Sequence, residues 1–148
     1  MNYQKIILEM NTFFQKYKEL EYKQHTIKDL NFAEVQTIVL LAKNSQLTLA
    51  DISRERNISR SAVTQVIKKL ERKHYINRVK VDDKRFNFEL TEQGQAVCQE
   101  HYQQHSYLNE HLEVLLKQYP EEFFQMLSQL MSEVEYFWDH LPWNGEKE

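Results

Sequence analysis

The segment 59–73 carries hydrogen-bonding side chains opposite an apolar stripe at helical spacing. The stripe recurs at intervals of three and four residues, which predicts one buried helix face, and consists of Val63, Val66, Ile67 and Leu70. Ser59 stands where its hydroxyl can cap the helix start. The opposite face carries groups that hydrogen-bond base edges and phosphates, namely Arg60, Ser61, Thr64, Gln65 and Lys68. This face predicts recognition of nucleic acid.

A second set of residues could bind a metal ion. His101 and His105 lie four residues apart in a segment expected to be helical, so both imidazoles can face one ion. Glu100 precedes them and offers a carboxylate. Paired histidines at this spacing are also common on the polar face of a helix, so surface histidines are the alternative interpretation.

The elements around segment 59–73 predict a winged helix. A short helix over 49–56, capped by Thr48, precedes it, and Asn57 stands where a tight turn needs a left-handed residue. After it, apolar residues alternate on both sides of a charged tip at 82–85, which is typical of a β-hairpin. We expect the recognition helix 59–73 to enter the major groove and the wing 78–90 to reach the minor groove or the backbone.

Four pieces of sequence, in this order and spacing, resemble the MarR family of bacterial transcriptional regulators. They are LTLADIS, SRSAVTQVIKKLERKHYI, Asp83-Lys84-Arg85 and Leu90-Thr91-Glu92-Gln93-Gly94. The resemblance implies a homodimeric winged-helix regulator, acting as a repressor on pseudo-palindromic duplex DNA. It also implies that Asp83 orients Arg85 for the minor groove. The wing is one residue shorter than is usual in the family, so Lys84 is the alternative occupant of the groove.

The resemblance extends to a zinc-responsive branch of the family, which takes ligands from a Glu-His-x-x-x-His run in this helix. The run 100–105 is similar to it. By position, Glu19 and His25 match two further ligands of that branch, whereas Gln36 and Thr37 stand at its second-helix positions and do not suit zinc. A zinc-responsive regulator that uses His101 and His105 is therefore an alternative form of the same function.

Two other signals are known in the family. Some members bind a small aromatic or lipophilic effector in a cleft, which aromatic residues such as Phe13, Phe14 and Tyr17 could line; plain core packing is the alternative. Others sense peroxide through a cysteine in the first helix. The single cysteine here, Cys98, lies elsewhere and lacks neighbouring cations, so we expect it to be a packing residue.

The charge distribution agrees with a nucleic-acid partner, although the net charge of the chain is −3. Segment 54–85 holds eleven Lys and Arg against four Asp and Glu, a net charge of +7, while the rest of the chain carries −10. A basic segment on an acidic body is the electrostatic pattern of a DNA-binding protein. A helical interaction module that binds an acidic protein partner, without binding DNA, is the remaining alternative.

Long amphipathic helices are predicted at both ends, over 2–24, from Thr91 to about residue 118, and from Pro120 onward. Their apolar surface exceeds what one small domain buries, which predicts a homodimer; a monomer with a larger helical core is the alternative. The chain is thus expected to be mainly α with a small β-hairpin wing. We assign residues 30–91 to the winged helix-turn-helix part and 1–25 and 92–141 to the dimerisation part of one domain, 1–148.

No enzyme motif is found in the sequence, so we predict a protein that is not an enzyme. No stretch approaches the roughly 20 apolar residues of a membrane helix, and the N-terminal segment is not a signal peptide. With a single cysteine, the chain fits a reducing compartment, and we expect a cytoplasmic protein.

Overall fold

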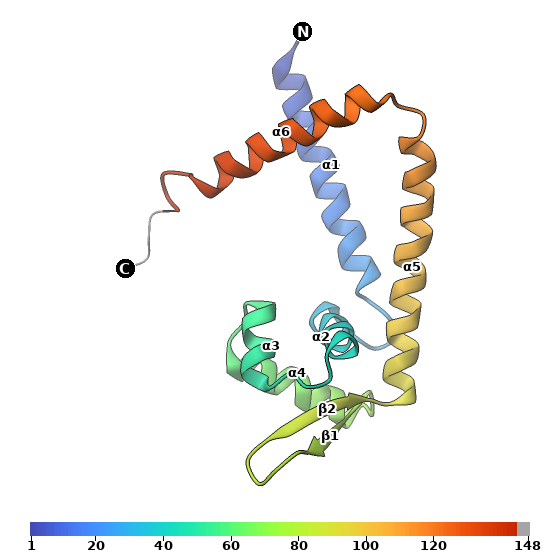
Figure 1. The fold of residues 1–148 in the computed structure, drawn as a ribbon, viewed down its shortest axis with the longest axis vertical. Helices are drawn as coiled ribbons and strands as arrows, with labels where there is room; N and C mark the ends of the chain where they lie inside the picture. The colour runs from blue at the N-terminus through green and yellow to red at the C-terminus, as the bar shows by residue number, and fades with distance from the viewer. Residues whose placement is uncertain (145–148) are drawn as a thin grey trace. The chain divides into compact units, whose positions relative to one another are not determined.

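Six helices and a two-stranded hairpin follow one another along residues 1–144, the part of the chain that the computed structural model describes. The predicted fold class, mainly helical with a β-hairpin wing, is confirmed (Figure 1). The elements are α1 (Tyr3–Gln24), α2 (Phe32–Lys43), α3 (Leu49–Arg56), α4 (Arg60–Arg72), β1 (Ile76–Lys80), β2 (Phe86–Leu90), α5 (Glu92–Leu116) and α6 (Glu121–Asp139).

The helices begin where the sequence supplies caps. Asn31 and Thr48 each accept a hydrogen bond from a backbone N–H three residues on, and the carboxylates of Glu34 and Asp51 accept from the cap residues in return. These capping boxes satisfy backbone groups that a helix start leaves unpaired. Asn57 ends α3 in the left-handed conformation, with φ of 50°. The turn between α3 and α4 is thus the one predicted.

Three boundaries differ from the prediction. The hairpin begins at Ile76, two residues before the predicted wing, because Ile76 pairs with Leu90 at the base of the antiparallel register. Pro120 is the N-cap of α6, one position before the first helical residue. The fifth helix, expected to reach about residue 118, ends two residues earlier, at Leu116.

The chain divides into two compact units, Met1–His105 and Ser106–Glu148. In the first unit, α2, α3 and α4 gather beside the hairpin (Figure 1). The core of this unit consists of buried aliphatic and aromatic side chains from each of its elements except α1. It includes Val35, Ile38, Leu41, Ile52, Val63, Ile67, Leu70, Ile76, Phe88 and Val97. This core holds α4 with its opposite face outward.

Much apolar surface lies outside this core. On α1, Phe13 is 68% exposed and Tyr17 is 58% exposed. In the second unit, none of the residues of α6 is buried, although the helix carries large apolar side chains such as Met126 and Phe137. Within residues 1–144, no helix has the length and apolarity required to cross a bilayer.

Candidate functional site

The exposed face of α4 carries most of the residues predicted to contact DNA. The hydroxyl of Ser59 accepts a hydrogen bond from the backbone N–H of Ala62 at 3.1 Å, which confirms the predicted cap. Arg60, Ser61, Gln65 and Lys68 are exposed, while Thr64 is half-buried and donates its hydroxyl to the carbonyl of Arg60 at 2.9 Å. One helix face therefore presents two cations, an amide and hydroxyl groups to solvent.

The turn before α4 is fixed by local hydrogen bonds. The hydroxyl of Ser53 donates to the carbonyl of Ile58 at 2.6 Å, which ties α3 to the residue before the cap of α4. At the other end of α3, hydrogen bonds from the backbone N–H and hydroxyl of Thr48 lower the pKa of Asp51 to about 2. Asp51 therefore stays ionised as the partner of its cap residue.

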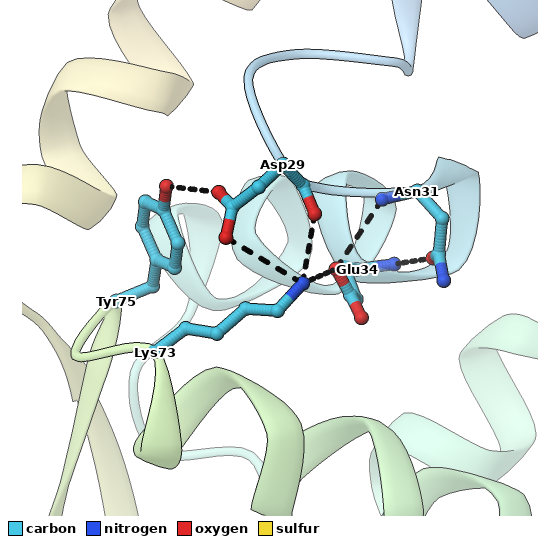
Figure 2. Close-up of polar contacts among 5 residues, drawn as sticks. All are labelled: Asp29, Asn31, Glu34, Lys73 and Tyr75. Atoms are coloured by element: carbon cyan, nitrogen blue, oxygen red, sulfur yellow. Dashed lines mark hydrogen bonds and ion pairs between the residues drawn. The ribbon is translucent and has the colours of Figure 1, made fainter.

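A polar network fixes the C-terminal end of α4 to the segment that precedes α2 (Figure 2). The ammonium of Lys73 donates to the carbonyl oxygen of Asp29 at 2.8 Å and to Oε2 of Glu34 at 3.0 Å. The side chain of Glu34 is only 3% exposed, so Lys73 neutralises a buried carboxylate. Glu34 also accepts from the backbone N–H of Asn31 at 3.2 Å.

Tyr75 joins this network from the start of the hairpin. Its hydroxyl donates to Oδ1 of Asp29 at 2.7 Å, and burial together with this hydrogen bond raises the pKa of Tyr75 to about 12. The carbonyl of Tyr75 accepts from the N–H of Thr91, and a Cβ added at Gly94 would lie 2.2 Å from that same oxygen. Only glycine at position 94 lets α5 start this close to the hairpin.

Asp82 holds Arg85 at the wing tip, and Asp83 does not. One oxygen of Asp82 accepts from the backbone N–H groups of Lys84 and Arg85, and the other accepts from Nε of Arg85 at 2.7 Å. These contacts lower the pKa of Asp82 below its usual value. Asp83 lies instead 3.4 Å from the ammonium of Lys80. The prediction that Asp83 orients Arg85 was therefore wrong, because the tight tip brings the first of the two aspartates under the guanidinium.

Three histidines meet between α1 and α5. His25 follows α1, and its Nε2 lies 3.0 Å from Nε2 of His101, which in turn lies 3.1 Å from Nε2 of His105. The ring nitrogens that could bind a metal all lie within 4.8 Å of one another. Nδ1 of His25 lies 2.8 Å from the carbonyl of Glu21, which favours a proton on Nδ1 and a free lone pair on Nε2.

The protonation state of His101 suits the binding of a metal ion. His101 is buried, and its burial, together with the neighbouring His105 and His25, lowers its pKa to about 4. It is therefore neutral near pH 7, as a metal-binding imidazole must be. Nδ1 of His101 is buried without a hydrogen-bond partner among the described residues. His101 and the imidazoles of His25 and His105, whose Nε2 atoms converge on it, form a donor set that fits zinc.

The cluster opens onto a hollow of about 400 Å³. Charged and polar side chains from several helices line it, including Glu21, Gln36, Lys43, Glu55 and Arg56. The aromatic residues of α1 considered for an effector cleft, Phe13, Phe14 and Tyr17, are exposed and do not line this hollow.

The other residues considered as metal ligands or as a redox site are not part of this cluster. Glu100 is not among the grouped ligands, and Glu19 accepts from the amide of Gln15 on α1. Thr37 is buried and accepts from the guanidinium of Arg56 at 2.8 Å. Burial raises the pKa of the Cys98 thiol, which disfavours the reactive thiolate, as expected for a packing residue.

Comparison with known proteins agrees with this geometry. Residues 28–85 match the model of the MarR family, whereas a search of curated proteins gave no match. FabT of Streptococcus pneumoniae, solved in complex with DNA, is 23% identical, with a TM-score of 0.72 over 93% of this chain and 98% of that one.

Two further solved structures have the same fold. ZitR of Lactococcus lactis, a zinc-responsive MarR family member, is 22% identical with a TM-score of 0.71, over 90% of this chain and 99% of that one. It has also been solved with DNA. AdcR of Streptococcus pyogenes, an adhesin competence repressor, is 24% identical with a TM-score of 0.61, over 89% and 93% of the two chains. The resemblance predicted from the sequence is therefore confirmed over residues 28–85, which match the MarR family model, and the chain as a whole has the fold of these structures.

Proposed function

We propose that the protein is a homodimeric DNA-binding transcriptional regulator, acting as a repressor, with α4 in the major groove and the wing at the minor groove. The observation that carries this proposal is the outward face of α4. The side chains of Arg60, Gln65 and Lys68 make no hydrogen bond or ion pair with any residue from 1 to 144 and are free to contact a ligand. Arginine and glutamine are suited to reading guanine and adenine edges.

The wing supplies a second contact at a fixed place. Arg85 is exposed, and Asp82 holds its guanidinium through Nε, so its terminal nitrogens remain available to a minor groove. We therefore assign the minor groove to Arg85 and a backbone contact to Lys84. FabT and ZitR, which have this fold, have been crystallised with DNA, and AdcR is a repressor by name.

The apolar surface of α1 and α6 supports a dimer. Phe13 and Tyr17 on α1, and Met126 and Phe137 on α6, are each more than half exposed in the single chain. Surface of this kind is covered in obligate two-fold assemblies. A dimer would also present two copies of α4 to two half-sites of a pseudo-palindrome.

Selection from a pool of random duplexes tests the proposal. We expect enrichment of sequences with two inverted half-sites, bound by two chains per duplex, with light scattering giving the mass of a dimer before DNA is added. A pool that stays random after repeated rounds, at a salt concentration where charge alone no longer retains DNA, would contradict it.

A second candidate function, zinc sensing, is favoured by the histidine cluster. His25, His101 and His105 would hold the ion, which would supply a cross-link between the end of α1 and the middle of α5. ZitR, of the same fold, is zinc-responsive. Titration of the metal-free protein with Zn²⁺, in competition with a chromophoric chelator, tests whether this site binds the ion.

A further inference from the structure

Only part of the wing packs against the hydrophobic core. Ile76 at the base of the hairpin and Phe88 at the middle of β2 are buried, whereas Val81 and Phe86, nearer the tip, are exposed. An isolated two-stranded hairpin is marginally stable and flexible. A contact beyond the core is therefore needed to fix the direction of the wing relative to α4.

Arg78 makes such a contact. Its Nε and Nη2 donate to the two carboxylate oxygens of Glu71, at 3.0 and 3.2 Å. The guanidinium carbon lies 5.2 Å from the ring centroid of Phe86 and 5.6 Å from that of Phe88. A forked ion pair stacked on two rings holds the guanidinium in one orientation.

This contact joins the two DNA-contacting elements of the proposed function. Glu71 lies in the last turn of α4, and Arg78 lies at the centre of β1, opposite Phe88 in the register. Arg85 lies at the tip of the same hairpin. A change in the angle between α4 and β1 would therefore move Arg85 away from the minor groove of a duplex whose major groove holds α4. Restraint at Arg78 therefore acts on the position of Arg85.

The charge of Glu71 supports the same interpretation. Segment 54–85 contains four acidic residues in a strongly basic stretch. Asp82 and Asp83 hold cations of the wing tip, and Glu71 holds Arg78. A carboxylate near DNA phosphates weakens binding by repulsion unless it also positions a group that favours binding.

We propose that Glu71 and Arg78 are a positioning pair that sets the wing at the angle at which Arg85 and α4 engage one duplex together. The proposal rests on the proposed DNA-binding function. Neither residue needs to touch DNA for this role. If Arg78 instead only bound phosphate, removal of Glu71 would free it and tighten binding.

The sign of the effect of Glu71→Ala separates these cases. We expect the full-length variant to bind its selected duplex about tenfold more weakly, although it loses a negative charge. The control Glu89→Ala removes an equal charge from β2, where the carboxylate makes no hydrogen bond or ion pair with residues 1–144, and should bind at least as tightly as wild type. In an Arg85→Ala background, Glu71→Ala should have little further effect, because the wing contact is already lost.

Hydrogen exchange without DNA tests the restraint itself. In Glu71→Ala, the amides of residues 79–87 should exchange faster than in wild type, while those of α4 stay protected. Unchanged exchange in the wing, tighter binding by Glu71→Ala, or an undiminished loss in the Arg85→Ala background would each overturn the proposal. If wild type binds no duplex selectively, the DNA-binding function fails, and the exchange data still decide whether the pair restrains the wing.

Discussion

Asp82 and Arg85 form a closed pair at the tip of the wing. Nε of Arg85 donates to one carboxylate oxygen of Asp82 at 2.7 Å, while the backbone N–H of Arg85 donates to the other at 2.9 Å. The side chain and the main chain of the same residue are thus fixed by one carboxylate. This leaves the outer edge of the guanidinium in solvent, available to the proposed minor-groove contact.

Asp82→Ala is expected to weaken binding to the selected duplex by about 1–2 kcal/mol, because Arg85 loses its fixed orientation. Charge alone predicts the opposite, since the variant is less negative. Asp83→Ala is the matched control, with the same change of charge at the next residue, and should bind no worse than wild type. Equal affinities of the two variants, measured by fluorescence anisotropy, would refute the role of Asp82.

Gly94→Ala is expected to destabilise the protein by about 1–3 kcal/mol. Alanine favours a helix over glycine by roughly 1 kcal/mol, so without a clash the variant would be more stable. The added Cβ would meet the carbonyl oxygen of Tyr75 at 2.2 Å, and that backbone atom is held by Thr91. Urea unfolding gives the sign, with Gln93→Ala as an exposed control in the same turn; a Gly94→Ala protein as stable as wild type would show that α5 can shift freely.

Lys73→Met is expected to lower the free energy of unfolding by about 1–3 kcal/mol, because the carboxylate of Glu34 is left buried without its cation. Adding Glu34→Gln should restore part of the loss, since no unpaired charge remains. Lys69→Met removes an exposed lysine of the same helix and should have little effect. A Lys73→Met variant that matches Lys69→Met in urea would mean that water replaces the ammonium at no cost.

Zinc binding is expected to depend on three histidines from two regions of the sequence. Variants His25→Ala, His101→Ala and His105→Ala should each lose at least about a hundredfold in affinity. The ring of His111 contacts the carbonyl of Tyr107 and lies outside the cluster. The variants His111→Ala and Glu100→Ala should therefore bind zinc as wild type does. Chelator competition measures all five, and retention of the wild-type affinity by His25→Ala would remove this residue from the site.

The local parts of the fold could be predicted because their causes lie within a few residues of each other. The caps of Thr48 and Ser59 and the left-handed turn at Asn57 were predicted from residue type and spacing alone, and the structure confirms them. The apolar stripe of α4 likewise predicted which of its faces is buried. The observed boundaries differ from the predicted ones where a contact between distant residues sets them. Ile76, for example, extends the strand because it pairs with Leu90.

The contacts between distant residues could not be predicted in this way. Nothing in the spacing of His25 and His101 shows that the end of α1 meets the middle of α5, and only the resemblance pointed to His25 at all. The same resemblance suggested Glu19 and Glu100, which lie outside the cluster. The pairs of Lys73 with Glu34 and of Arg78 with Glu71 depend on how helices and hairpin pack, which no local pattern encodes.

The central claim, selective recognition of duplex DNA, is tested most directly with the DNA upstream of the gene for this protein. Its affinity is compared with that for a scrambled duplex of equal length at two salt concentrations. We predict binding at least about a hundredfold tighter to the upstream DNA, falling steeply as salt rises, with Arg85→Ala weaker by about 1–3 kcal/mol on that DNA. Equal affinity for both duplexes, with zinc present or removed, would contradict the account.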